Sequence, residues 1–516
     1  MEEKAKSGQV KKPEERVKKA LCATLEFNKA HKISVESTFI RALPGFSIVG
    51  MANQSIQESK DRIKSSLLSV GYKFPTQKIT INLSPSDIKK DGSHFDLVIA
   101  LLIYFQKSSF TCKDFYIFGE LGLDGEVRTT GSIFPILLSL AKQQKNIKVL
   151  LPYEIVKKAS QIEGIEVYGV RTLKEAIDFF TDELYKSEPF VDKNYRFYQK
   201  RIEINSKTYY YDEDFPLDFR DVKGHNFLKR ALVVSAAGMH NVLLEGSPGC
   251  GKSMSIKRLR YILPPLSMEE VLDINAYSES DDLIAKRPMR SPHHSSSKPS
   301  IFGGGSSKAM AGEVALANHG ILFFDEFPHF SKQVLEALRE PLEDNRVLIS
   351  RVKNKVEYSA KFLFAAALNP CPCGNLLSKT KECRCSDVDI ARYRAKLSEP
   401  ILDRIDIYLQ VDEEFSKDET LSSKEMFEMV LRAFKAQKRR GQEELNAKLS
   451  ETEIAKYCIL DTEAKEVLDR AILNFSLNQR SVGKLLKIAR TVADIEGHKD
   501  IQKSDIIEAF GYRRRA

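Results

Sequence analysis

Residues 241–253 read NVLLEGSPGCGKS, a short apolar run followed by a loop that matches the pattern G-x-x-x-x-G-K-[ST] at every fixed position. In such a loop the glycines let backbone N–H groups turn inward around phosphates, the lysine reaches the terminal phosphates and the hydroxyl holds Mg²⁺. The apolar spacing of the next segment, SMSIKRLRYIL, is typical of a helix, whose N-terminus attracts anions. We therefore predict a strand, a loop and a helix that bind ATP and Mg²⁺ through Gly246, Ser247, Pro248, Gly249, Cys250, Gly251, Lys252 and Ser253.

A second apolar run, ILFF at 321–324, ends in Asp325 and Glu326. A strand at this position would bring Asp325 beside the loop, where its carboxylate and the Ser253 hydroxyl would hold Mg²⁺, while Glu326 polarises the attacking water. The alternative is an edge strand that ends in two solvated acids. The phosphate-binding loop upstream favours the first interpretation.

Three further polar residues have positions that suit ATP hydrolysis. Asn369 ends the apolar run FLFAAAL, at the sheet edge where ligands bind in open α/β folds, and is expected to orient the water. Arg404 precedes the strand pattern IDIYLQV, and an arginine offered to a neighbouring subunit's γ-phosphate stabilises transition-state charge. A salt bridge to Asp403 or Asp406 explains Arg404 equally well. Arg480 begins an amphipathic helix and could reach the nucleotide from a helical domain.

Five segments carry a resemblance to a known family: SPHH (291–294), GEVALANHGILFFDE (312–326), REPLED (339–344), ALNPCPCG (367–374) and LLKIARTVADIEG (485–497). Together they resemble the magnesium-chelatase-like AAA+ proteins, and among these the ComM (YifB) competence-protein family. The resemblance covers nearly the whole chain after residue 20. It implies a homo-oligomeric ring, most simply a hexamer, with ATP at the subunit boundaries.

The same resemblance assigns roles to the residues above. Lys252 and Ser253 match Walker A, Asp325 and Glu326 match Walker B, and the sensor 1, arginine-finger and sensor 2 positions fall on Asn369, Arg404 and Arg480. The role that it implies is ATP-driven branch migration of DNA in recombination or natural transformation.

The fold class expected is α/β. Residues 87–101 and 119–142 resemble the Lon-protease fold, so we expect a Lon-protease-like α/β domain, then a P-loop AAA+ domain and a C-terminal helical lid. Apolar segments at 46–50, 78–83, 95–105 and 148–152 are predicted as strands of the first domain. The expected boundaries are a charged tail at 1–20, the Lon-like domain at 21–184, a connector at 185–216, the AAA+ domain at 217–412 and the lid at 413–516.

The Lon-like domain lacks the residues of the protease. Lon chemistry uses a serine activated by a lysine. Residues 87–101 and 119–142 resemble that fold, but the serine and lysine positions fall on His94 and Phe134. We expect a scaffold or partner-binding module rather than a protease.

Residues 347–361, VLISRVKNKVEYSAK, alternate apolar and polar side chains and predict a β-hairpin. Its tip would carry Arg351, Lys353 and Lys355. A basic hairpin facing the channel of a ring would attract the phosphates of single-stranded or branched DNA. A solvated surface turn is the alternative.

Four cysteines follow Asn369 in the spacing CxC-x9-CxC: Cys371, Cys373, Cys383 and Cys385. Four thiolates can hold structural Zn²⁺, although zinc loops favour a longer C-x₂₋₄-C spacing. Unliganded or redox-sensitive thiols are the alternative.

The composition of the 516 residues, with a formal net charge of +9, permits nucleic-acid binding without requiring it. No run approaches the ~18 apolar residues of a membrane-spanning helix, and the charged N-terminus does not resemble a signal peptide. We expect a cytoplasmic protein with no membrane partner. The leading hypothesis is an ATP-hydrolysing DNA motor, and the rival is a chelatase-type or chaperone-type ATPase that remodels a protein partner.

Overall fold

The computed structural model describes residues 17–26, 28–108, 112–181, 189–192, 194–278, 280–304, 311–350, 355–412 and 421–513. The chain divides into two compact units. Unit 1 runs to Phe197 and also contains Asn275–Leu283, while unit 2 comprises Tyr198–Ile274 and the chain from Ile284 onward. No helix among these described ranges combines the length and the apolar character needed to cross a bilayer.

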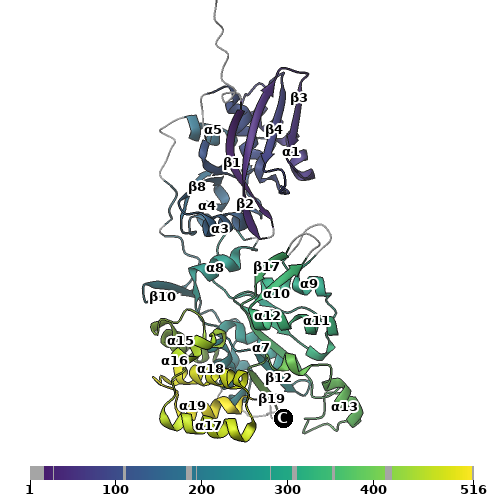
Figure 1. Ribbon diagram of the computed structural model, residues 1–516, viewed down its shortest axis with the longest axis vertical. Coiled ribbons are helices and arrows are strands. Elements are labelled where there is room, and N and C mark those ends of the chain that lie inside the picture. The colour runs from purple at the N-terminus through teal and green to yellow at the C-terminus, as the bar shows by residue number, and fades with distance from the viewer. Residues whose placement is uncertain are drawn as a thin grey trace, which may run out of the picture. The chain divides into compact units, whose positions relative to one another are not determined.

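Unit 1 is built on a mixed seven-stranded sheet with helices packed on it (Figure 1). Its strand order is β3-β4-β2-β1-β5-β8-β9. The strands are β1 (Val17–Glu26), β2 (Lys29–Ile40), β3 (Gly45–Val49), β4 (Lys78–Ser84), β5 (Cys112–Ile117), β8 (Ile147–Pro152) and β9 (Ile165–Val170). The helices are α1 (Gln54–Ser69), α2 (Asp96–Tyr104), α3 (Ile133–Gln143), α4 (Tyr153–Ala159) and α5 (Leu173–Thr181). Two short strands, β6 (Glu120–Leu121) and β7 (Val127–Arg128), form a separate hairpin.

Three of the four strands predicted in this unit are present, as β3, β4 and β8. The fourth prediction is wrong, because residues 95–105 contain helix α2 instead. All residues of α2 from Asp96 to Ile103 are buried, and a run that is apolar on every side fits a buried helix as well as a buried strand. The first strand also begins earlier than expected: Val17 lies inside the predicted tail, and β1 pairs with β2 from Val17↔Thr38 onward.

The two positions that replace the Lon dyad lie in the core of unit 1. His94 is fully buried, and its Nε2–H donates to the carbonyl of Ala23 at 3.0 Å. Its Nδ1 then accepts from the Ser132 hydroxyl at 3.1 Å. The Phe134 ring lies under the Lys158 ammonium, 4.5 Å from the ring centroid. Neither side chain can act as a serine nucleophile or its lysine base, which agrees with a scaffold.

Unit 2 is built on a parallel five-stranded sheet in the order β14-β15-β18-β12-β19. Its strands are β12 (Val242–Gly246), β14 (Met289–Arg290), β15 (Ile321–Phe324), β18 (Leu363–Leu368) and β19 (Ile407–Val411). The three central strands are buried throughout, which explains why they read as continuous apolar runs rather than as alternating ones. The helices of this α/β part are α6 (Asn226–Gly238), α7 (Lys252–Leu259), α8 (Met268–Asn275), α9 (Lys298–Phe302), α10 (Glu313–Leu316), α11 (Lys332–Ala337), α12 (Arg339–Asp344), α13 (Asp387–Arg394) and α14 (Glu399–Leu402).

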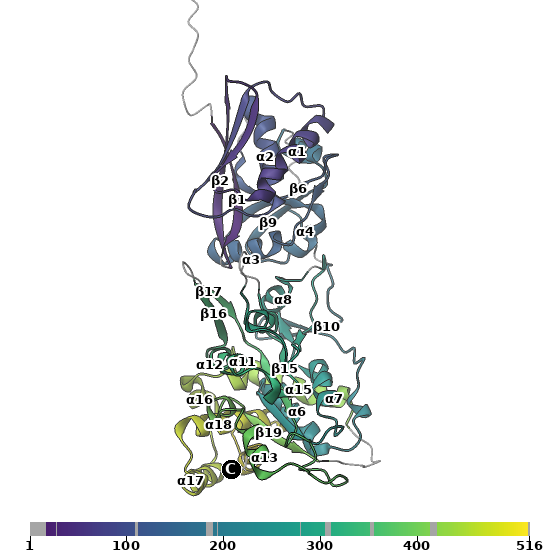
Figure 2. The same cartoon turned by 90° about the vertical axis from the view of Figure 1, so that its right-hand side faces the viewer.

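Two β-hairpins accompany the sheet. The predicted hairpin is present as β16 (Arg346–Ser350) and β17 (Lys355–Ser359), which run side by side in Figure 2. Arg351 and Lys353 lie outside the described residues, and so does the side chain of Lys355. The other hairpin is β10 (Lys200–Ile204) with β11 (Lys207–Tyr211), extended by β13 (Leu266–Ser267). It lies inside the segment predicted as a connector. Its aromatic residue Tyr209 packs edge-on against Phe434 of the helical domain, which gives this hairpin a place in the fold of unit 2.

The C-terminal part of unit 2 is helical, as predicted, and forms a group beside the sheet in Figure 1. Its helices are α15 (Ser423–Arg439), α16 (Glu451–Tyr457), α17 (Thr462–Phe475), α18 (Gln479–Glu496) and α19 (Lys503–Gly511). Capping boxes at Ser422 and Ser450 begin α15 and α16. One apolar cluster runs without a break from β12 and α6 into α15, α18 and α19.

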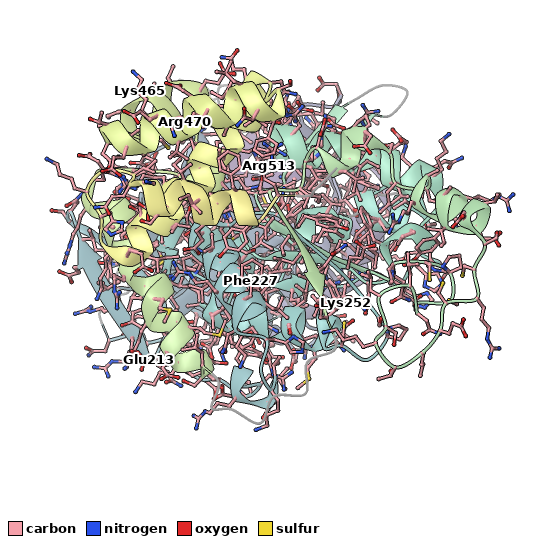
Figure 3. The ribbon with its side chains drawn as sticks, turned by 90° about the horizontal axis from the view of Figure 1, so that it is seen from below. Glu213, Phe227, Lys252, Lys465, Arg470 and Arg513 are labelled. Carbon is pink, nitrogen blue, oxygen red and sulfur yellow. The ribbon has the colours of Figure 1, made fainter. Side chains whose placement is uncertain are left out.

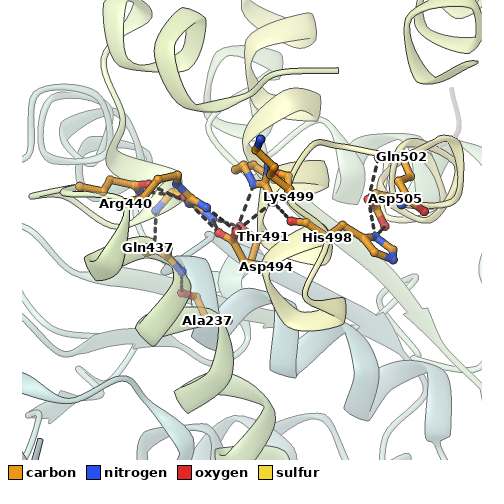
Figure 4. Close-up of polar contacts among 12 residues, drawn as sticks. Ala237, Gln437, Arg440, Thr491, Asp494, His498, Lys499, Gln502 and Asp505 are labelled. Carbon is orange, nitrogen blue, oxygen red and sulfur yellow. Dashed lines mark hydrogen bonds and ion pairs between the residues drawn. The ribbon is translucent and has the colours of Figure 1, made fainter. Parts of the chain in front are cut away.

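A buried polar network joins the helical domain to α6 (Figure 4). Asp494 accepts hydrogen bonds from Arg440 at 2.6 Å and from Arg490 at 3.1 Å. Gln437 donates to the carbonyl of Ala237, the last residue but one of α6, at 3.0 Å. Removing one member of such a buried ion pair costs about 3–5 kcal/mol, because it leaves an uncompensated charge.

His240, just after α6, belongs to the same interface. Its Nε2 bonds the Thr491 hydroxyl at 2.7 Å, and its Nδ1 faces Asp406 at 3.9 Å. Burial lowers the pKa of His240 to about 4, against the weaker opposite effect of Asp406. The imidazole is therefore neutral near pH 7.

Candidate ATP-hydrolysis site

The loop between β12 and α7 is shaped to receive phosphate groups. Gly249 and Gly251 both have φ of +87°, a conformation that favours glycine, and no atom lies within 4 Å of the place where a Cβ would stand. The Lys252 ammonium donates to the carbonyls of Gly246 at 2.6 Å and Ser247 at 2.9 Å. Lys252, which is labelled in Figure 3, is the first residue of α7. The uncrowded glycines, the lysine that folds back onto the loop and the helix N-terminus fit a nucleoside triphosphate.

The predicted magnesium ligands meet at this loop. The Ser253 hydroxyl donates to Asp325 Oδ2 at 2.8 Å. Strand β18 lies between β12 and β15, so the residue that follows β18 falls between the loop and Asp325. That residue is Asn369, and its Oδ1 accepts from Lys252 Nζ at 3.4 Å. A hydroxyl and a carboxylate oxygen at this spacing fit Mg²⁺, which takes few protein ligands beside phosphates.

Glu326 is held in an unusual backbone conformation. Its φ of +51° is left-handed, which costs a non-glycine residue about 1–3 kcal/mol and is found most often at functional sites. Its side chain is 55% exposed, and one carboxylate oxygen lies 3.5 Å from His294 Nδ1. Sequence reasoning missed His294 as a site residue. The only signal was its place in the SPHH segment, which carried the family resemblance.

Arg404 lies at the N-terminal ends of the parallel strands, whereas the phosphate-binding loop lies at their C-terminal ends. The side chain of Asn241, the residue before β12, donates to the Arg404 carbonyl at 2.9 Å, whereas the loop begins where β12 ends. Because β12 has five residues, the two ends are about 17 Å apart at ~3.3 Å per residue, farther than an arginine side chain reaches. The guanidinium pairs with Glu343 and with the Pro400 carbonyl, not with the predicted Asp403 or Asp406.

Arg480 lies with Arg404 rather than with the loop of its own chain. Its guanidinium is 3.2 Å from Glu343, the same carboxylate that Arg404 contacts. Both arginines line a cavity of 580 Å³ together with Lys448, Lys484 and Lys487. Sequence reasoning missed Glu343 as the common partner, because α12 and the start of α18 are far apart along the chain. Arg480 and Arg404 are thus brought together by one carboxylate.

The four predicted zinc ligands also come together. The sulfur atoms of Cys371, Cys373, Cys383 and Cys385 all lie within 4.8 Å of one another. The P-loop cysteine is different, since burial raises the pKa of the Cys250 thiol and keeps it protonated.

The parallel sheet, the glycine loop, the acidic pair after β15 and the attached helical domain define an ATPase of the P-loop AAA+ class. Comparison with known families agrees. "Magnesium chelatase, subunit ChlI" matches residues 218–419, "Subunit ChlI of Mg-chelatase" matches 35–155, and "Magnesium chelatase, subunit ChlI C-terminal" matches 420–513.

Two relatives match along almost their whole length. The protein YifB of Salmonella typhimurium is 36% identical over 502 residues, covering 94% of each chain. Competence protein ComM of Haemophilus influenzae is 32% identical over 496 residues, covering 93% of this chain and 94% of the relative. The chain belongs to the ComM/YifB family of magnesium-chelatase-like AAA+ proteins, as its motifs predicted, and this family implies ATPase activity with ATP and Mg²⁺.

A partial similarity supports the Lon-like component of the fold. Lon protease 2 of Bacillus subtilis is 28% identical over 168 residues, covering 31% of this chain and 28% of the protease. The name protease belongs to that relative; the positions expected to align with its serine and lysine hold His94 and Phe134 in this chain.

Proposed function

We propose that this protein is an ATP-driven ring motor that acts on single-stranded or branched DNA in the cytoplasm, as a branch-migration helicase in recombination or natural transformation. The observation that carries the ring is the separation of Arg404 and Arg480 from their own phosphate-binding loop by the length of β12. A head-to-tail contact, which closes into a ring, would place these arginines against the loop of the next subunit.

In this proposal each subunit boundary holds one ATP. Residues 246–253 bind its phosphates, and Ser253 and Asp325 hold Mg²⁺, which neutralises charge on the transferred phosphoryl group. Glu326 accepts the proton of the attacking water, and Asn369, fixed beside Lys252, orients that water.

The neighbouring subunit completes the site. Arg404 and Arg480, supplied together from one cavity edge, stabilise the charge that develops on the phosphoryl oxygens. We assign unit 1 to scaffold or partner binding, because the positions expected to align with the Lon dyad hold the buried side chains of His94 and Phe134.

Action on DNA is supported by two observations. One relative is named competence protein ComM. In the sequence, Arg351, Lys353 and Lys355 fall where β16 ends and β17 begins. Lysine and arginine contacts to phosphates are sequence-independent and weaken with salt, which suits a motor that must pass every base.

The test is the ATPase rate of the purified protein with and without single-stranded and forked DNA, together with the mass of the assembly in ATP. We expect DNA to raise the rate. Lys353→Ala/Lys355→Ala should weaken DNA binding and reduce the slope of log K against log salt by about 1 for each lost phosphate contact, with ATP affinity unchanged. The matched control is Lys465→Ala/Arg470→Ala, two exposed cations on α17 that Figure 3 labels.

Two results would contradict this function. If DNA leaves the rate unchanged and the hairpin variant binds DNA like the control across the salt titration, the motor does not act on DNA. Stimulation by a protein partner instead would favour the chelatase-type or chaperone-type alternative, which the family description of subunit ChlI makes the second candidate.

A further inference from the structure

The loop that follows Asn369 folds back on itself and brings two Cys-x-Cys pairs face to face. Cys371 Sγ lies 3.4 Å from Cys373 Sγ and 3.7 Å from Cys383 Sγ. Cys373 Sγ and Cys383 Sγ are 3.6 Å apart. With Cys385, all four sulfurs fall within 4.8 Å of one another, and no other group of three or more candidate ligands occurs among the described residues.

These distances fit a single tetrahedral metal ion. A zinc ion with four Zn–S bonds of ~2.3 Å sets its sulfurs about 3.8 Å apart, close to the observed separations. A disulfide would require a sulfur–sulfur distance of about 2.05 Å, and all four cysteines are free. An iron–sulfur cluster places several atoms between its cysteines and needs a wider cage. Thiolates are soft ligands, and a tetrahedral S₄ set is typical of zinc.

The backbone around the sulfurs suits thiolates. The N–H groups of Asn375 and Arg384 donate to the sulfur of Cys373, and the N–H of Cys385 donates to Cys383. Such hydrogen bonds stabilise negative charge on ligand sulfurs and orient them toward a metal. An arrangement of thiols without a metal would gain little from backbone donors aimed at several of its sulfurs.

The cysteine loop also touches the phosphate-binding loop. Cys371 is fully buried and lies two residues after Asn369. Gly374, with φ of +80°, packs so closely on Pro248 that a Cβ at position 374 would stand 2.7 Å from the proline ring. The position of Asn369 beside Lys252 thus depends on a loop that has no regular secondary structure between β18 and α13 to hold it.

We propose that the four cysteines bind one structural zinc ion that holds the Asn369 loop against the phosphate-binding loop. The ion takes no part in the chemistry. It replaces the secondary structure that this segment lacks and keeps Asn369 in register with Lys252. The proposal is independent of action on DNA.

The first test is metal content. The full-length protein, prepared without a polyhistidine tag, should contain about one zinc per chain by elemental mass spectrometry. Cys373→Ala/Cys383→Ala should lose it, whereas Cys458→Ala, a buried cysteine in the helical domain, should keep it. Zinc-free wild type loaded with Co²⁺ should show the thiolate-to-metal absorption of a tetrahedral S₄ site, which does not require any variant to fold.

The second test is the coupling. A mercurial releases the zinc, a chelator removes it and a reducing agent then frees the thiols. This treatment should lower kcat for ATP hydrolysis by up to about 10²-fold while ATP binding persists, and added zinc should restore kcat. Absence of zinc together with absence of the cobalt spectrum would overturn the site. Stoichiometric zinc whose removal leaves kcat unchanged would overturn its role in holding Asn369.

Discussion

Arg404 offers the sharpest test of the shared site. Because about 17 Å of β12 separates it from the loop of its own chain, Arg404→Ala should impair the site of the neighbouring subunit and not its own. An arginine finger contributes about 10³–10⁵-fold to kcat, so the variant alone should be almost inactive. Lys252→Ala should be inactive for a different reason, since its loop cannot hold the phosphates. Arg470→Ala on α17 is the matched surface control.

The assay mixes the two inactive variants at equal concentration and allows subunits to exchange before ATP hydrolysis is measured. A boundary works when the Arg404→Ala subunit supplies the loop and the Lys252→Ala subunit supplies the arginine. Random mixing makes about a quarter of the boundaries competent, whatever the size of the ring. We therefore expect activity near a quarter of wild type to appear from two preparations that have almost none.

A mixture that stays inactive, although a mass measurement shows mixed rings, would refute the reasoning. It would mean that Arg404 acts on the nucleotide of its own chain or not at all. If the Arg404→Ala variant hydrolysed ATP on its own, Arg480 would be the residue that stabilises the transition-state charge, because both guanidinium groups contact Glu343.

Other changes have equally definite outcomes. Glu326→Gln should keep ATP bound but slow hydrolysis by about 10²–10⁴-fold, which retention of labelled ATP during gel filtration would show; normal turnover would remove Glu326 from the mechanism. His294→Ala should lower kcat with little change in KM, because His294 contacts the Glu326 carboxylate at 3.5 Å and not the loop; a change confined to KM would contradict this. Burial lowers the pKa of His240 to about 4, so from pH ~6.5 down to ~4 the unfolded chain takes up a proton that the folded chain does not. The free energy of unfolding of unit 2 should therefore fall by up to about 3 kcal/mol over that range, and His240→Gln should remove this pH dependence. Chemical denaturation measures it, and the unfolding transition of unit 2 is the one that added ATP shifts. A wild-type-minus-variant difference that is constant with pH would disprove it.

The sequence predicted the parts of the fold that local pattern controls. The glycine loop with its strand and helix, the acidic pair after ILFF and the polar residue after FLFAAAL all have short, specific signatures, and the structure has them where the pattern placed them. Parallel strands end at one edge, so the meeting of Ser253, Asp325 and Asn369 followed from strand order alone.

Local pattern failed where packing decides. Residues 96–103 are all buried, and periodicity cannot tell a helix from a strand there. Glu343 joins two arginines from segments far apart in the chain, which no spacing rule can show. The Asn275–Leu283 segment belongs to unit 1 although unit 2 surrounds it in sequence, because long-range contacts and not composition assign it.

The unbroken apolar cluster between the sheet and the C-terminal helices has a mechanical consequence. Arg490 and Asp494 are buried in the same interface, and one continuous core joins the two parts. We expect a displacement at the γ-phosphate to pass through this core to the C-terminal helices, so that each subunit of the ring tilts as one rigid lever.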